Sequence, residues 1–111
     1  MALTKDEVFE KIAHKDVIVL NILPTEDFRK LHIRGSASFP MKKDMSEFSQ
    51  EVADKFGKDK HFIFYGERLG MLDSYLAASA LLAKGLRAEN YPGGLLEWFR
   101  SGMPVEGTDA K

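Results

Sequence analysis

The strongest constraint on the fold of this chain comes from two almost unbroken apolar runs, residues 17–22 and 61–65. Both runs are rich in β-branched or aromatic residues, and each has the length of a strand rather than of a helix. A strand with one solvated face would alternate apolar and polar residues, so continuous runs predict strands that are covered on both faces. Strands of this kind are typical of parallel sheets with helices on both sides.

Helical patterns lie before, between and after the two runs. Thr4 followed by Glu7 is a capping-box pattern, and it predicts a helix over residues 4–13. Further helices are predicted over residues 25–31, 44–56, 73–84 and 95–100, and short strands over residues 36–39 and 88–91. Strands that alternate with helices along the whole chain predict an α/β fold with a parallel sheet and right-handed crossovers.

Length and composition indicate one globular domain. The 111 residues, of which 44% are hydrophobic and 30% charged, are enough for one core and too few for two. We place the domain at residues 1–105 and expect residues 106–111 to form a flexible C-terminal tail. Basic and acidic residues are interspersed and leave a net charge of −1, which argues against a nucleic-acid partner. Because no apolar stretch is long enough for a membrane span or a signal core, we expect a cytoplasmic protein.

The chain contains no cysteine, which excludes disulfides, thiolate metal sites and a thiol nucleophile. Its three histidines, His14, His32 and His61, fall on different predicted elements without the spacing of metal ligands. We therefore expect no metal site and no cofactor, and we expect His32 to bond to the backbone at a turn. The sequence does not predict an oligomeric state, so a monomer is the default.

The loop after the second apolar run is the natural place for a ligand, because parallel sheets bind ligands beyond the carboxyl ends of their strands. Its residues are Gly66, Glu67, Arg68, Leu69, Gly70, Met71 and Leu72. Successive backbone N–H groups, helped by Arg68, could attract a small anion, although Glu67 would weaken the attraction. Leu69, Met71 and Leu72 would instead suit a protein surface. The loop could also be a plain connector in which one or two of these side chains pack inward.

Three stretches of the sequence carry residues in the order and spacing of a known family. The matching residues are His32, Ile33, Gly35 and Pro40 in the first stretch, Ser74, Ala77, Ala78, Lys84 and Gly85 in the second, and Gly93, Gly94, Trp98, Gly102, Pro104 and Val105 in the third. In this respect the chain resembles the single-domain rhodanese-like, or sulfurtransferase-fold, family. The resemblance implies a three-layer α/β/α domain with a five-stranded, mostly parallel sheet, and a loop that cradles an anionic sulfur species.

The chain departs from the family pattern at the residues that carry its chemistry. Where active members have a cysteine directly after the strand, the resemblance places Gly66. Neither Tyr65 nor Ser74 can replace that cysteine, because a persulfide needs a sulfur atom held as a thiolate. The family's Asp-x-Arg pair at the end of the first buried strand is altered as well. Asn21 stands at the place of the aspartate, and Leu23 stands at the place of the arginine.

We therefore predict a catalytically inactive rhodanese-like domain with no catalytic residue. It would act as a binding or regulatory module that presents the former active-site loop to a protein or a small anion. The alternative is a component of a sulfurtransferase pathway that docks the persulfide-carrying cysteine of a partner in trans. A hydrolase that uses Glu67, Asp73 or Ser74 is a third hypothesis, which we place last because no Ser, His and Asp group has a suggestive spacing.

Overall fold

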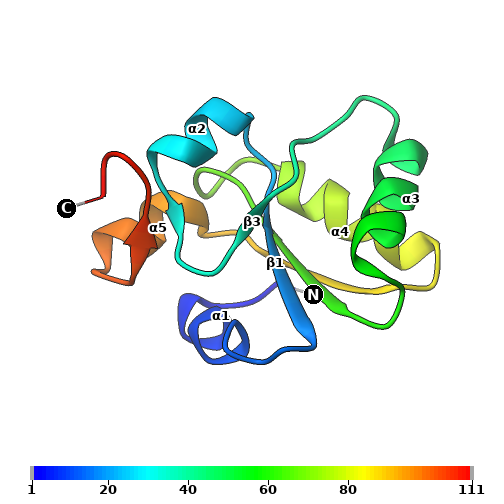
Figure 1. Cartoon of the computed structure of the whole chain (residues 1–111), viewed down its shortest axis with the longest axis horizontal. Coiled ribbons are helices and arrows are strands. Elements are labelled where there is room, and N and C mark those ends of the chain that lie inside the picture. Colours follow the sequence, from blue (N-terminus) through cyan, green and yellow to red (C-terminus); the bar gives the residue numbers. More distant parts are fainter. Residues whose placement is uncertain (1, 111) are drawn as a thin grey trace.

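The computed structural model describes residues 2–110, in which helices alternate with strands as expected (Figure 1). In chain order the elements are α1 (Lys5–Lys11), β1 (Val17–Asn21), α2 (Thr25–Lys30), β2 (His32–Ile33), β3 (Ala37–Ser38), α3 (Met45–Phe56), β4 (His61–Tyr65), α4 (Asp73–Ala83), β5 (Arg87–Tyr91), α5 (Gly94–Arg100) and β6 (Val105–Glu106). Both apolar runs form strands, and each predicted helix is present within a few residues of its expected bounds.

The main sheet is parallel throughout and has the strand order β3-β1-β4-β5. This arrangement confirms the predicted α/β fold class. The sheet has four strands where five were expected. Among the described residues, the pairing at the outer edge of β5 is a single parallel bridge between Ala2 and Asn90. One bridge is too short to make a strand, and the chain enters α1 three residues later.

Each face of the sheet carries its own apolar core, which explains why β1 and β4 are continuously apolar. On one face, Leu20 and Phe64 pack with α3 and α4. On the other, Val19, Ile63 and Tyr65 pack with residues of α1 and α5 (Figure 1). The prediction that both strands are covered on two sides is confirmed, because side chains that alternate along each strand enter different cores.

Helix ends follow the local signals in the sequence. The predicted capping box of α1 is confirmed: the hydroxyl of Thr4 accepts from the amide of Glu7 (3.2 Å), and the Glu7 carboxylate accepts from the amide of Thr4 (2.9 Å). In α5, Trp98 is buried against the sheet, whereas Phe99 faces solvent. No helix within residues 2–110 is long and apolar enough to cross a membrane.

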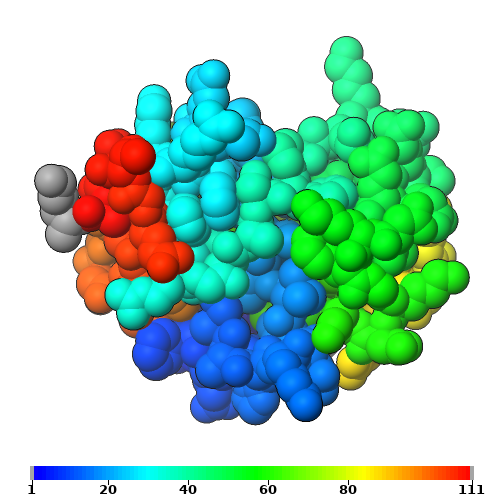
Figure 2. All heavy atoms as spheres, viewed as in Figure 1, coloured from blue at the N-terminus to red at the C-terminus, as the bar shows by residue number. Residues whose placement is uncertain are grey.

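A second, antiparallel sheet joins β2 to β6 and has only two residues in each strand. Beyond β6, the amides of Thr108 and Asp109 donate to the carbonyls of Arg29 and Lys30 (3.0 and 2.8 Å). Figure 2 shows the result, with the C-terminal segment lying directly beside α2. These bonds attach the chain up to Asp109 to the domain, and the domain boundary at residue 105 stays a prediction.

Candidate functional site

The predicted loop, residues 66–72, lies beyond the carboxyl ends of the central strands. Asn21, Tyr65 and Tyr91 end β1, β4 and β5 and stand in register across the sheet. The loop leaves β4 directly after Tyr65 and leads into α4. Chain connectivity therefore places all seven predicted loop residues at the edge where ligands of parallel sheets bind.

The start of α5 holds the base of the loop. The amides of Leu95 and Leu96 donate to the carbonyls of Gly66 and Glu67, at 3.0 and 2.7 Å. Gly94 makes this close approach possible, because a Cβ there would lie 2.8 Å from backbone atoms of Glu67 and Arg68. Its φ of +71° is also one that other residues rarely adopt. In the sequence Gly94 stood out only as a residue that matches the family pattern, and its contact with the loop was not predicted.

The outer part of the loop presents apolar side chains and unpaired amides. Leu69 is 73% exposed and Leu72 67% exposed, and Met71 also faces solvent. Leu69 and Leu72 therefore do not pack inward, whereas Met71, at 38% exposed, is more covered than either. Within residues 2–110, no backbone amide from Glu67 to Leu72 donates to another protein group. The loop thus offers both an apolar surface and free hydrogen-bond donors to a binding partner.

Gly66 itself is not required by the backbone. Its φ lies outside the left-handed region, and an added Cβ would contact only the side chain of Ile22, at 3.9 Å. That distance is an ordinary van der Waals contact. The fold would therefore accept a side chain, including a cysteine, at position 66, so backbone strain does not explain the glycine.

The altered strand end forms an uncharged hydrogen-bond network around the hydroxyl of Tyr65. Asn21 Nδ2 donates to this oxygen (2.9 Å), and so does the amide of Ile33 (3.0 Å). Ser36 Oγ lies 2.8 Å away and already donates to the carbonyl of Ile33. The Tyr65 hydroxyl must therefore donate to Ser36, and its full capacity of one donor and two acceptors is used.

This network explains what Asn21 contributes that an aspartate could not. Asn21 is fully buried, and its Oδ1 accepts from the amide of Leu23 (2.9 Å) while its Nδ2 serves Tyr65. A carboxylate has no donor for Tyr65, and it would place a charge in the core. Leu23, at the place of the family's arginine, packs against the apolar core that the sheet forms with α1 and α5. Together the two changes replace a charged corner by a neutral one.

Burial raises the pKa of the Tyr65 hydroxyl, because the charged phenolate is disfavoured away from water. Burial also raises the pKa of Tyr91, and the hydrogen bond from its hydroxyl to Glu97 and the negative charge of that carboxylate raise it further. Both tyrosines keep their protons in the folded chain at a pH where the unfolded chain loses them.

We therefore expect alkaline unfolding. The stabilisation is complete below pH ~10, the unfolded pKa of tyrosine, and is lost as pH rises toward the folded values. The free energy of unfolding should fall above pH 10 by about 1.4 kcal/mol per pH unit for each of the two tyrosines. Urea unfolding at a series of pH values measures this slope, and Tyr91→Phe should halve it. An unchanged slope in Tyr91→Phe would contradict the account.

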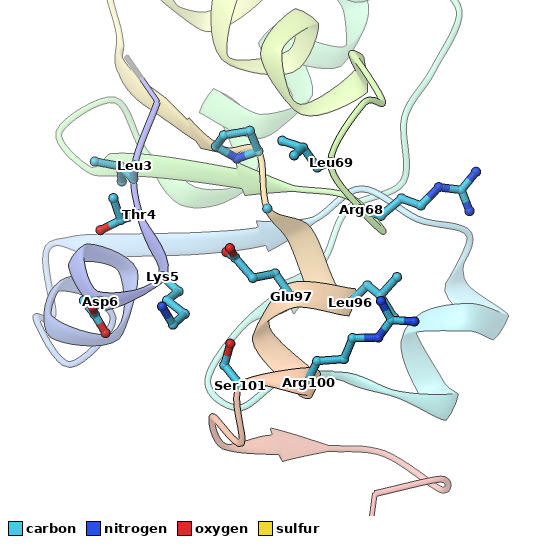
Figure 3. A pocket seen from close by; sticks show the side chains of 12 residues that line it. Leu3, Thr4, Lys5, Asp6, Arg68, Leu69, Leu96, Glu97, Arg100 and Ser101 are labelled. Carbon is cyan, nitrogen blue, oxygen red and sulfur yellow. The ribbon is translucent and has the colours of Figure 1, made fainter.

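A cleft of about 800 Å³ adjoins the loop (Figure 3). It is lined by Leu3, Thr4, Lys5, Asp6, Arg68, Leu69, Pro92, Gly93, Leu96, Glu97, Arg100 and Ser101. Figure 3 shows the start of α1 on one side, the loop on another and α5 between them. Three basic and two acidic residues line it, so its charge is mixed. The sequence did not predict this cleft, because its walls come from opposite ends of the chain.

The histidines do not form a site in the structure. The ring Nδ1 of His32 lies 2.7 Å from the carbonyl of Phe28, which confirms the predicted backbone bond. The ring also stacks on the side chain of Phe28, with 3.8 Å between the ring centres. Residues 2–110 bring together no group of three His, Asp or Glu side chains that could hold a metal ion.

Comparisons with known proteins agree with this fold. The family model described as Rhodanese-like domain matches residues 4–101. The BH2092 protein from Bacillus halodurans has a similar structure, with a TM-score of 0.85 and 22% identity over 99% of this chain and 81% of its own. A rhodanese-related protein from Thermoplasma volcanium has a TM-score of 0.75 and 23% identity, covering 95% of this chain and 96% of its own. No curated protein matches the chain.

Proposed function

Because the chain belongs to the rhodanese-like domain family and contains no cysteine, we propose that it is a non-catalytic module that binds a protein partner through residues 66–72. One observation carries the proposal: the loop is held firmly at its base while Leu69, Met71 and Leu72 face solvent. A loop that is already held at its base is suited to binding, because less of its backbone must be ordered when the partner docks.

The two hydroxyl side chains that flank the loop in the sequence, Tyr65 and Ser74, do not offer a substitute nucleophile. Ser74 is buried on the inner face of α4, and the Tyr65 hydroxyl is fully engaged by Asn21, Ile33 and Ser36. Neither could carry a sulfur atom as a persulfide in any case. A binding role uses what the loop keeps, which is its shape and its exposed side chains.

Charge favours a protein over a small anion as the partner. Glu67 stands next to Arg68 in the loop, and Figure 3 shows the Arg68 side chain directed away from the start of α1, not across the cleft. In the cleft, Asp6 and Glu97 oppose the basic residues. Exposed leucines and a methionine are instead characteristic of surfaces that contact proteins.

Site-specific crosslinking tests the proposal. A photoreactive phenylalanine analogue in place of Leu69 should yield one dominant crosslinked protein in an extract of the source cells, and excess unlabelled protein should suppress it. The same analogue in place of Phe9, which is exposed on α1, is the matched control. Met71→Glu in the Leu69 variant should remove the product. Equal crosslinking from positions 69 and 9, or none from position 69, would refute the proposal.

A second candidate, docking of a partner's persulfide in trans, is supported by the space above Gly66 and the free amides that follow it. Thiosulfate, sulfite and phosphate are suitable probes, because they are small anions and the amides would meet a negatively charged persulfide. Titration should shift the amide resonances of residues 66–72, and Arg68→Glu should weaken the effect. Shifts confined to other residues would exclude an anion site in the loop.

A further inference from the structure

Helix α4 is apolar on the face that points away from the sheet. Its inner face carries the buried residues Ser74, Ala77, Ala78 and Leu81. The outer face of α4 consists of Tyr75, Leu76, Ser79, Ala80, Leu82 and Ala83, and its three large side chains are about half exposed. No charged residue stands between Asp73 and Lys84. A surface helix normally carries polar residues on its solvent side, so this face is unusual for one that stays in water.

The residues of this face are arranged in lines along the helix. At 100° per residue, Leu76, Ser79 and Ala83 lie along its centre. Tyr75 and Leu82 form one flank. Asp73 and Lys84 lie on the opposite flank, at the two ends of the helix. The spacing of three and four residues along the centre is the spacing by which two helices pack against each other.

We infer that the outer face of α4 docks a second copy of this chain, with the two α4 helices antiparallel about a two-fold axis beside Ser79. A two-fold axis of this kind places the same flank of the two α4 helices side by side. It also sets the N-terminal end of one helix beside the C-terminal end of the other. Asp73 then meets Lys84 of the partner subunit, and the pair occurs twice. On the other flank, Tyr75 meets Leu82 of the partner subunit, also twice.

The charges select the antiparallel arrangement. A parallel pair about a two-fold axis would set the charged flank of one helix against the apolar flank of the other, which leaves Asp73 and Lys84 without partners. Small residues favour close packing at the centre, because Ser79 and Ala80 lie at the midpoint of the helix. Leu76 can then fit among Ser79, Ala80 and Ala83 of the partner subunit.

This dimer goes beyond the proposed function and does not depend on it. α4 has 11 residues, so it is about 16 Å long at 1.5 Å per residue. In the antiparallel pair, residues 66–71 of the two copies lie at opposite ends of the shared interface. Residues 66–71 stay available in both copies, whereas Leu72, the N-cap of α4, lies beside the interface.

Sedimentation equilibrium tests the dimer with two matched variants. The wild-type protein should have twice the chain mass of 12.5 kDa. Leu76→Glu on the outer face of α4 should return it to 12.5 kDa, whereas Leu69→Glu in the loop should leave the dimer intact. Both leucines are exposed, so folding should survive, and circular dichroism checks it. A wild-type mass of 12.5 kDa at the highest soluble concentration, or a dimer unaffected by Leu76→Glu, would overturn the inference.

Charge reversal tests the antiparallel pairing itself. Asp73→Lys and Lys84→Asp should each weaken the dimer about tenfold, because each sets two like-charged pairs across the interface. An equimolar mixture of the two variants should form a mixed dimer of wild-type strength, since opposite charges again face each other at both ends. A mixture that dimerises no better than either variant alone would overturn this pairing. The crosslinking partner of Leu69 plays no part in either result, so this test and that of the proposed function can fail separately.

Discussion

Replacing Gly94 with alanine is expected to lower the free energy of unfolding by about 3 kcal/mol. Two effects add at this position. The backbone has a φ of +71°, which strains any residue with a Cβ, and that Cβ would lie 2.8 Å from backbone atoms of Glu67 and Arg68. To relieve this overlap, the loop must move away from α5. That movement lengthens the hydrogen bonds that the amides of Leu95 and Leu96 donate to the loop.

Gly66→Ala is the matched control for this experiment. Gly66 lies outside the left-handed region and its Cβ would meet only Ile22, at 3.9 Å. Alanine there should change the free energy of unfolding by less than about 1 kcal/mol, in either direction. Urea unfolding followed by the fluorescence of the buried Trp98 measures both variants. Equal losses in Gly94→Ala and Gly66→Ala would show that the contact between α5 and the loop does not hold the loop in place.

Tyr65→Phe is also expected to lower the free energy of unfolding by about 3 kcal/mol, through the loss of hydrogen bonds. The substitution keeps the ring but removes the oxygen that accepts from Asn21 Nδ2 and from the amide of Ile33. Both donors are in a buried environment, and each donor left without a partner costs about 1–3 kcal/mol. Ser36 also loses the hydrogen bond from the tyrosine.

Tyr75→Phe provides the comparison, because Tyr75 is exposed and its hydroxyl has no partner among the described residues. Its removal should change the stability by no more than about 0.5 kcal/mol. Thermal unfolding of the two variants and the wild type gives the difference directly. A loss in Tyr65→Phe as small as in Tyr75→Phe would mean that the network around Tyr65 does not stabilise the strand ends.

The main features of the fold were predictable because they depend on local patterns. Continuous apolar runs indicated β1 and β4, and the capping box of Thr4 and Glu7 marked the start of α1. The β2–β6 sheet was missed, since two residues in each strand carry no periodicity. Pairing at Ala2 instead of a fifth strand was missed for the same reason, because one residue has no pattern.

The candidate site was predictable only in part. Its position followed from chain order, because a loop after a central parallel strand must lie at the carboxyl edge of the sheet. The contacts that shape it are long-range: Gly94 against Glu67, and Tyr65 against Asn21. Residues so far apart in the sequence give no signal of their contact. For the same reason, the part of α1 in the cleft wall could not be foreseen.

The proposed function requires that this domain keep the rhodanese-like scaffold without its sulfur-transfer chemistry. The most direct measurement is the formation of thiocyanate from thiosulfate and cyanide by the purified protein. With no cysteine in the chain to carry the persulfide, the rate should equal that of the reaction without protein. Thiocyanate formation above that rate, abolished by substitutions within residues 66–71, would contradict the account.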